Sequence, residues 1–356
     1  MFQSYYTYIL LQQQKSTFVL RSFINLRMRA NPKTSSNNKI IAVAPMMAWT
    51  DRHCRFLHRL FSKDVLLFTE MISSSAIIQG GQTKLLDYSD EEHPIAIQFG
   101  GNEPLELAKC AELATQYNYD EINLNVGCPS PRVQKGAFGA SLMREPNLVA
   151  ECLAQMKKAS PLPVTVKCRL GLGGNETTQF LHTFIDKIAN AGCQRVYVHA
   201  RIAILEGLSA AQNRSIPPLQ PDKVRRLKET FPELEIVFNG GISNKEEVFE
   251  TLNWADGVMI GRAAYQDPEL LALISNPDQS IGLNKTLEHV IDYSTYVQDQ
   301  IERGEKLNRL TRPLLNCFSG TRGAKAYRQI LSDSVKLKTN DPSIIDEAIS
   351  QLSFSP

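Results

Sequence analysis

One cysteine near the middle of the chain stands where its thiol could do chemistry. Cys128 closes the sequence Asn125-Val126-Gly127-Cys128, and Pro129 follows it. A thiol can donate a proton to a carbanion-like centre or attack an electrophile. No base stands at a fixed spacing from Cys128, which disfavours a hydrolase of the Cys-His type. Proton donation and nucleophilic attack on other substrates both stay open.

Two glycine-containing segments in the second half of the chain predict a phosphate site. Asn239-Gly240-Gly241 and Gly261-Arg262 each follow a short apolar run. Glycines let backbone N–H groups approach an anion closely, and an arginine adds a bidentate cation. A lone Gly-Gly pair is more often a turn, but the second segment one unit later favours an anion-binding corner.

Three polar residues are suited to a flavin ring. Lys167 and His199 end neighbouring apolar runs and could meet the electron-rich edge of the ring, while Gln98 could pair with its pyrimidine part. A buried lysine needs an anionic partner, which a reduced flavin supplies.

The elements that must position these residues alternate regularly after residue 38. Short β-rich runs alternate with segments of helical periodicity, as in βα units. The eight runs are Ile40–Ala44, Val65–Thr69, Ile95–Phe99, Glu121–Asn125, Val164–Lys167, Arg195–His199, Glu235–Asn239 and Gly257–Ile260. The helical segments are His53–Phe61, Pro104–Tyr117, Asn147–Ala159, Thr177–Asn190, Asp222–Thr230 and Asn244–Asn253, with an irregular connection at Ile72–Glu92. We predict an α/β fold: a TIM (β/α)8 barrel followed by a smaller, all-helical C-terminal domain.

In such a barrel the carboxyl ends of the strands meet on one face, where active sites lie. A polar strand end is ordinary by itself, but polar residues follow all eight runs. We therefore expect them to line one pocket.

The predicted domains are a barrel at residues 38–275 and a helical domain at residues 280–356, preceded by an extension at residues 1–37. The first 50 residues contain no acidic residue but six basic ones. This composition is typical of a transit segment. It is more often that of a disordered tail, or of an upstream extension of a gene whose start is Met28. The expected location is the cytoplasm, or an organelle if the segment is a transit peptide.

The composition excludes several classes of protein. The 356 residues carry a formal net charge of only +2, which excludes a histone-like polycation. No apolar run is long enough for a membrane helix. Seven cysteines without a C-x-x-C pair match neither a disulfide framework nor a zinc site. We expect no membrane association, no metal and a monomer.

A cluster of basic residues near the C-terminus predicts a nucleic-acid surface. Between Lys306 and Leu331 there are six basic residues and no acidic one, in two triplets with i, i+3, i+6 spacing. Each triplet could form a stripe along a helix. The first triplet is Lys306, Arg309 and Arg312, and the second is Arg322, Lys325 and Arg328. A solvated basic face is the usual alternative, but phosphate-backbone binding is favoured beside a separate barrel.

Taken together, these motifs resemble the tRNA-dihydrouridine synthases, in order and with matching spacing from about residue 40 to about residue 335. Asp120–Asn125 and Asn213–Leu219 point to the A subfamily. The motifs are Ala44-Pro45-Met46, Thr69-Glu70-Met71, Asn125–Pro129, Val166–Arg169, His199-Ala200-Arg201, Asn239–Ile242 and Asp256–Arg262.

The resemblance implies an FMN enzyme that uses NADPH to reduce the C5–C6 bond of D-loop uridines in tRNA, at positions 20 and 20a in the A subfamily. It makes Cys128 the catalytic proton donor to C5. It assigns FMN binding to Pro45, Met46, Met47, Gln98, Lys167, His199, Asn239, Gly240, Gly241, Gly261 and Arg262. It assigns tRNA binding to Asn125, which would hold the flipped uracil, and to Arg201, Ala211, Arg214, Lys325 and Arg328. The A subfamily often has a basic residue where this chain has Ala211.

Two other functions fit parts of the pattern. One is an FMN-dependent dehydrogenase of a free pyrimidine, of the dihydroorotate type, which would have no need of a basic helical domain. The other is a non-catalytic RNA-binding barrel, for which Cys128, Lys167, His199 and Arg262 would have no use. A colourless purified protein would indicate the latter.

Overall fold

The computed structural model describes residues 39–174, 177–277 and 282–353, and the extension predicted at residues 1–37 lies outside them. Eight parallel strands follow one another around a sheet in the order β1-β8-β7-β6-β5-β4-β3-β2. The Val43 N–H donates to the Leu66 carbonyl at 2.9 Å, and the Leu66 N–H donates to the Ile41 carbonyl at 2.9 Å. These two hydrogen bonds join the open edges, so the sheet closes into the predicted TIM barrel.

Each predicted run is a strand, and the structure differs only at the strand ends. The strands are β1 (Ile40–Val43), β2 (Leu67–Ser73), β3 (Ile95–Gly100), β4 (Glu121–Val126), β5 (Val164–Arg169), β6 (Arg195–His199), β7 (Glu235–Asn239) and β8 (Gly257–Ile260). Because side chains alternate along a strand, each strand sends one set inward and packs the other against helices.

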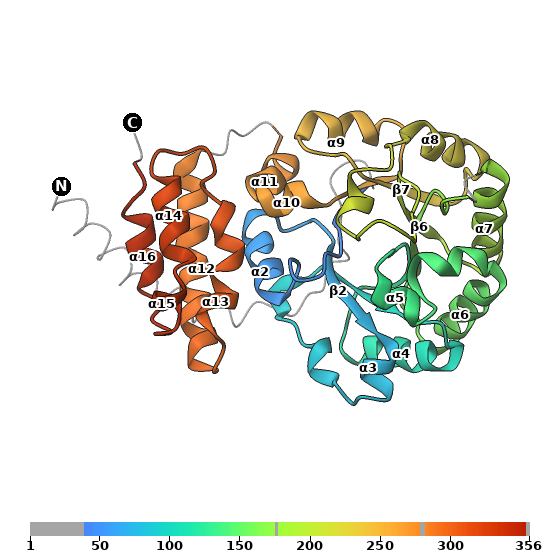
Figure 1. Cartoon of the computed structure of the whole chain (residues 1–356), viewed down its shortest axis with the longest axis horizontal. Coiled ribbons are helices and arrows are strands. Elements are labelled where there is room, and N and C mark those ends of the chain that lie inside the picture. The colour runs from blue at the N-terminus through green and yellow to red at the C-terminus, as the bar shows by residue number, and fades with distance from the viewer. Residues whose placement is uncertain (1–38, 175–176, 278–281, 354–356) are drawn as a thin grey trace. The chain divides into compact units, whose positions relative to one another are not determined.

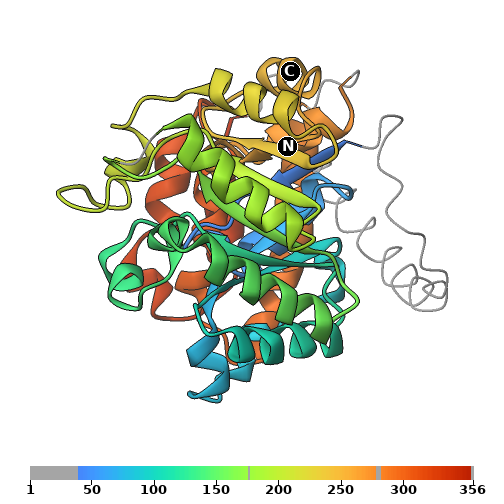
Figure 2. The same ribbon diagram turned by 90° about the vertical axis from the view of Figure 1, so that its right-hand side faces the viewer.

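Helices cover the outside of the sheet, as Figures 1 and 2 show. Asp51, Thr177 and Asn244 cap the N-termini of α2, α7 and α9 with their side chains. The barrel helices are α2 (Arg52–Phe61), α4 (Pro104–Gln116), α6 (Pro146–Ala159), α7 (Thr178–Asn190), α8 (Pro221–Thr230), α9 (Lys245–Leu252), α10 (Arg262–Gln266) and α11 (Glu269–Ser275). The connection after β2 contains α3 (Ser74–Ile78) and two short 3-10 turns, in agreement with its irregular sequence.

The C-terminal part of the chain is helical. Its elements are α12 (Leu283–Glu302), α13 (Leu307–Leu310), η5 (Arg312–Asn316), α14 (Ala324–Leu331), α15 (Ser334–Leu337) and α16 (Ile344–Ile349). Tyr293 and Val297 of α12 share a buried apolar cluster with Leu57 and Phe61 of α2. The ring of Phe56 stacks on that of Tyr296 at a centroid distance of 3.9 Å. These contacts seat the helical segment on the barrel helix that follows β1.

The two basic triplets do not form continuous helical stripes. Lys306 precedes α13, Arg309 lies on it, and Arg312 begins the separate turn η5. Arg322 lies outside α14, because Gly323 adopts a φ of +91° just before that helix begins. Only Lys325 and Arg328 share a helix.

No helix within residues 39–174, 177–277 and 282–353 has the length and apolar character needed to cross a membrane. Among the same residues, no group of three or more His, Cys, Asp or Glu side chains is placed to hold a metal ion.

Candidate active site

Cys128 lies in a loop that the preceding asparagine holds in place. The Asn125 Oδ1 atom accepts hydrogen bonds from the N–H groups of Gly127, at 3.1 Å, and Cys128, at 2.9 Å. The Cys128 carbonyl accepts the Ala140 N–H at 2.9 Å. The other cysteines are buried, whereas Cys128 is half-buried. Cys128 is therefore the thiol within residues 39–353 that a molecule at this end of the barrel can reach.

Arg169, at the end of β5, ties this loop to two others. Its Nε donates to the Gly127 carbonyl at 3.0 Å, and its Nη1 donates to the carbonyls of Ile202 and Asn213 at 2.9 Å each. Burial lowers the pKa of Arg169 to about 10. Within the described chain no carboxylate forms an ion pair with Arg169, so carbonyl oxygens alone satisfy the buried cation. Sequence reasoning placed Arg169 at a strand end of the pocket but gave it no role.

Gln98 lies inside the barrel below the cysteine loop, and only 1% of its surface is exposed. Its Oε1 accepts from Asn125 Nδ2 at 2.8 Å, and its Nε2 donates to Asn123 Oδ1 at 2.8 Å. Each amide nitrogen has two N–H groups, and one of each pair is used here. The structure thus brings together the predicted residues Gln98, Asn125 and Cys128.

Lys167 reaches across the barrel mouth to β7. Its Nζ donates to Asn239 Oδ1 at 2.9 Å, and Asn239 Nδ2 donates to the Met259 carbonyl at 2.8 Å. Burial, and then the positive charge of Arg169, lower the pKa of Lys167 to about 8. No carboxylate in the described residues pairs with it. An anionic ligand at this point would supply the missing countercharge and raise that pKa.

His199, at the end of β6, is held neutral. Burial, together with the charges of Arg169 and Lys167, puts the pKa of its imidazole well below the usual range. Its Nδ1 is buried and has no hydrogen-bond partner among the described residues. Such an atom favours a ligand that completes the hydrogen bond.

The predicted anion-binding corner lies beside His199. Gly240 and Gly241 follow β7 with φ angles of +120° and +80°. A Cβ atom at Gly240 would lie 3.2 Å from His199 Cδ2, and one at Gly241 would lie 2.5 Å from a Leu219 methyl. Only glycine fits both positions without strain. Gly261 precedes α10, and a Cβ there would meet open space.

Three arginines gather at this corner. Arg262 is exposed, and its Nη2 donates to the Arg214 carbonyl at 3.4 Å. Burial and then the Arg262 charge lower the pKa values of Arg201 and Arg214. The Arg201 guanidinium donates to the Pro217 carbonyl, while its Nε is buried without a partner in the described structure. The cations repel one another, and an anion placed between them would relieve that repulsion.

The remaining predicted residues of the barrel lie at its mouth. Pro45 and Met46 are half-buried after β1, and the Met46 N–H donates to the Thr50 hydroxyl at 2.9 Å. Met47 is 63% exposed. Ala211 is exposed at the start of the short turn Gln212–Arg214, and its side chain makes no polar contact.

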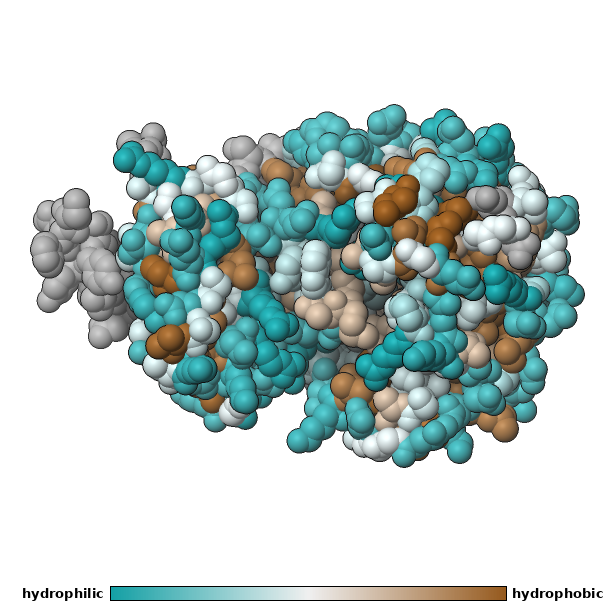
Figure 3. Space-filling model, viewed as in Figure 1, coloured by the Kyte–Doolittle hydropathy of each residue, from teal (hydrophilic) through white to brown (hydrophobic). Residues whose placement is uncertain are grey.

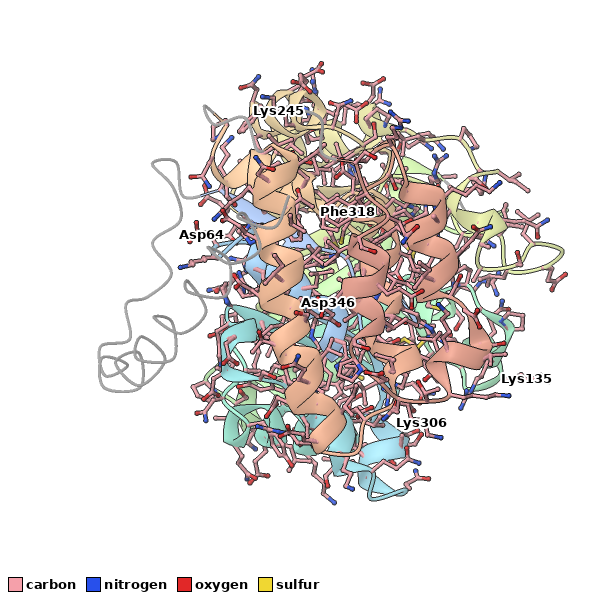
Figure 4. The ribbon with its side chains drawn as sticks, turned by 90° about the vertical axis from the view of Figure 1, so that its left-hand side faces the viewer. Asp64, Lys135, Lys245, Lys306, Phe318 and Asp346 are labelled. Carbon is pink, nitrogen blue, oxygen red and sulfur yellow. The ribbon has the colours of Figure 1, made fainter. Side chains whose placement is uncertain are left out.

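Lys325 and Arg328 lie on α14, far along the chain from the strand ends. Figure 4 looks onto the C-terminal helices, of which α14 is one, and Figure 3 shows mainly hydrophilic residues over them. Lys325 is exposed and Arg328 half-buried. In the described part of the chain neither forms an ion pair, whereas the Arg309 Nη1 lies 3.1 Å from Glu305 Oε2.

Sequence reasoning gave no role to Glu121, Asn123 or Thr165 inside the barrel. Glu121 and Asn123 alternate along β4 with the predicted Asn125, and that spacing could have indicated one polar inward face. Thr165 in the run Val-Thr-Val-Lys carries no such signal, because threonine is an ordinary strand residue.

Comparisons with known proteins match the whole of the described fold. A family model for dihydrouridine synthase (Dus) matches residues 42–353. A tRNA-dihydrouridine(20/20a) synthase from Synechocystis sp. is 45% identical over 316 residues, which cover 88% of this chain and 95% of that protein. Proteins of the same name from Xanthomonas campestris pv. campestris and Pseudomonas putida are 46% and 42% identical. Those matches cover 85% and 92% of this chain, and 90% and 99% of the respective relatives.

Proposed function

The chain belongs to the dihydrouridine synthase family, and from that membership we propose that it reduces uridine in tRNA to 5,6-dihydrouridine, with FMN as cofactor and NADPH as electron donor. The relatives' names place the reaction at positions 20 and 20a of tRNA, and we propose the same positions here. The observation that carries the proposal is the reachable thiol of Cys128, whose loop is held by Asn125 at the same end of the barrel as a neutral His199 and a Lys167 that has no carboxylate partner among the described residues.

The residues at the barrel mouth fit FMN. The phosphate would lie at Gly240, Gly241, Gly261 and Arg262, where positive φ angles and open space let backbone N–H groups approach an anion. The orphaned His199 Nδ1 and the Lys167 ammonium would face the ring. At this place FMN would supply two-electron hydride chemistry between NADPH and C6 of the uracil.

Cys128 would complete the reduction. Negative charge develops on O4 and C5 when hydride reaches C6, and the Cys128 Sγ would give its proton to C5. The loop geometry holds that thiol at the mouth through Asn125 Oδ1 and Arg169 Nε. One hydride and one proton account for the two hydrogen atoms that the uracil gains.

Asn125 would orient the base, while Gln98 would face the pyrimidine part of the flavin. Each keeps one amide N–H that makes no hydrogen bond within the described residues, after donating the other inside the barrel. The carbonyl oxygens of uracil and of the flavin ring are suitable acceptors for such donors. The base would have to leave its stack to reach Asn125.

The helical segment would hold the tRNA backbone. Lys325 and Arg328 have no competing carboxylate in the described structure and so are available to phosphates. Arg201 and Arg214 would contact the RNA nearer the reacting base. A tRNA substrate agrees with either location predicted from the sequence, the cytoplasm or an organelle with its own tRNA.

The experiment that tests this function uses an unmodified tRNA transcript, FMN-loaded protein and NADPH, followed by mass analysis of the nucleosides. We expect a nucleoside two hydrogen atoms heavier than uridine, and its loss when U20 and U20a are replaced by cytidine. Product only from a free pyrimidine would support the dehydrogenase alternative. No product from any of these would contradict the proposed activity.

A further inference from the structure

A chain of hydrogen bonds runs through the inside of the barrel, from the cysteine loop to a buried carboxylate. Asn125 accepts hydrogen bonds from the loop N–H groups and donates one to Gln98, and Gln98 donates one to Asn123. The donor–acceptor distance is 2.8 Å in each of the two hydrogen bonds between amide side chains. Asn123 Nδ2 then donates to Thr165 Oγ1 at 2.8 Å. The Thr165 hydroxyl lies 2.7 Å from Glu121 Oε1. Every donor points away from Cys128 and toward Glu121.

The direction of this series of hydrogen bonds is set at both of its ends. An amide turned by 180° exchanges its donor and acceptor, so three amides in a row could in principle point either way. The loop end offers only backbone N–H donors, from Gly127 and Cys128. The other end is a carboxylate, which accepts.

Thr165 transmits the direction. Its hydroxyl proton has two acceptors, Glu121 Oε1 at 2.7 Å and the Ile122 carbonyl at 3.2 Å. Because Glu121 is the nearer and charged acceptor, the hydroxyl proton lies toward it, and the Thr165 oxygen is left to accept from Asn123 Nδ2. Asn123 Oδ1 must then face Gln98, and Gln98 Oε1 must face Asn125.

Glu121 is surrounded by donors, which oppose the burial that raises the pKa of its carboxyl group. Arg195 Nη1 lies 2.6 Å from its Oε2, and the Tyr197 hydroxyl lies 2.9 Å and 3.1 Å from its two oxygens. Glu121 and Thr165 are each only 2% exposed. A buried carboxylate with this many donors holds its position and its role as acceptor.

We infer that Glu121 and Thr165 are positioning residues for the cysteine loop: the carboxylate sets the orientation of three amides, and the last amide holds Gly127 and Cys128. If the amides turned, Asn125 Nδ2 would face the two loop N–H groups, donor against donor, and the loop would move. The inference rests on the proposed function for its activity readout only.

The test compares Thr165→Val with Thr165→Ser and Thr286→Val. Valine keeps the shape of threonine but removes the acceptor for Asn123, whereas serine keeps it. Thr286 on α12 is the matched control, because it is fully buried and its hydroxyl has no partner in the described structure. The measurements are kcat and KM for tRNA, the melting temperature, and the rate at which iodoacetamide alkylates Cys128, identified by peptide mass.

We expect Thr165→Val to lower kcat roughly 10- to 100-fold, as displaced catalytic groups do, with KM for tRNA changed less than about two-fold. Alkylation of Cys128 should become several-fold faster. Thr165→Ser should stay within about three-fold of the natural protein in both measurements, and Thr286→Val should change neither at temperatures where it is folded.

Three results would overturn the inference: Thr165→Val behaving like Thr286→Val, failure of serine to restore both readouts, or a kcat loss without faster alkylation. The rate of Cys128 alkylation can be measured whether or not the protein catalyses the reaction. If the natural protein made no dihydrouridine, the proposed function would fail, while unchanged alkylation of Cys128 in Thr165→Val would separately reject the positioning role.

Discussion

The mouth of the barrel and the surface of α14 use polar residues in opposite ways. At the mouth, Asn125, Gln98 and Arg169 are buried and bonded to named atoms on other strands and loops. On α14, Lys325 and Arg328 have no ion-pair partner in the described chain. The difference follows from what each region must do. Proton and hydride transfer need atoms held in place, whereas binding of a phosphate backbone needs charges free to reach it.

The largest effect should come from removing the one reachable thiol. Cys128→Ala should lower dihydrouridine formation roughly 10²- to 10⁴-fold, the usual contribution of a positioned acid. FMN content and NADPH oxidation should persist, because the alanine leaves the Asn125 and Arg169 contacts to the loop backbone. The measurement is product formed per NADPH consumed.

A buried cysteine gives the matched control: Cys110→Ala on α4 should leave the ratio of product to NADPH unchanged. Near-natural product formation by Cys128→Ala would show that another group supplies the proton.

Removal of the phosphate cation should weaken cofactor binding. Arg262→Ala should lower FMN affinity roughly 10- to 100-fold, since a hydrogen bond to a charged group contributes about 1.5–3 kcal/mol. Fluorescence titration of cofactor-free protein measures this. Arg225→Ala is the control, because that exposed arginine lies on the outer helix α8, where its guanidinium carbon is 5.2 Å from the ring centroid of Trp254. Equal losses in both variants would mean that Arg262 does not meet the phosphate.

Lys167 predicts a pH dependence of cofactor affinity. Its pKa of about 8 in the free protein lies below the ordinary 10.5, and an anionic partner would raise it in the complex. Between the pKa of Lys167 in the free protein and its raised value in the complex, binding of reduced FMN, whose ring is anionic, takes up a proton. The affinity should therefore fall as pH rises above about 8, by at most about ten-fold per pH unit.

Lys167→Met should remove this pH dependence and lower the affinity below pH 8. Titrations between about pH 7 and 9.5 measure both effects. The same slope in the natural protein and in Lys167→Met would assign the titration to another group.

The α14 surface should respond in KM and salt dependence. Replacing Lys325 and Arg328 by alanine should raise KM for tRNA several-fold and reduce the slope of affinity against salt by about 1 per lost contact, with FMN content unchanged. Lys285→Ala serves as control, because Lys285 Nζ lies 2.7 Å from Glu288 Oε2. A salt slope that stays unchanged in the double variant would remove α14 from the tRNA interface.

The smallest effect is expected for the neighbouring paired cation. Arg309 already forms an ion pair with Glu305 at 3.1 Å, so Arg309→Ala should change KM for tRNA less than about two-fold. A loss as large as that of the α14 variants would show that exposed charges in this segment act by proximity to RNA, whether or not they are paired.

The barrel was predictable from the sequence because each strand is a short apolar run with polar residues at or just after its carboxyl end. The predicted runs Arg195–His199 and Glu235–Asn239 agree with β6 and β7 residue for residue. Most of the barrel's site residues could be named from their types and positions at strand ends, whereas Ala211 and Arg214 rest on the family resemblance alone. Their roles as ligands of FMN and tRNA stay predictions.

Partners across strands were not predictable in the same way. Alternation shows which side chains point inward, but the contact of Thr165 with Asn123 and Glu121 depends on strand register. Arg169 is satisfied by three carbonyls from distant loops, and carbonyls carry no sequence signal. The predicted helical stripes of basic residues were too long, since Gly323, in the left-handed conformation, separates Arg322 from α14.

The central claim is that electrons pass from a nicotinamide through a flavin in this barrel to a uridine of tRNA. The most direct test is an anaerobic absorbance titration of the FMN-loaded protein, first with NADPH and then with unmodified tRNA transcript. We predict that the flavin bands bleach with NADPH and return when tRNA is added without oxygen. A colourless protein that takes up no FMN, or bands that return only with a free pyrimidine, would contradict the account.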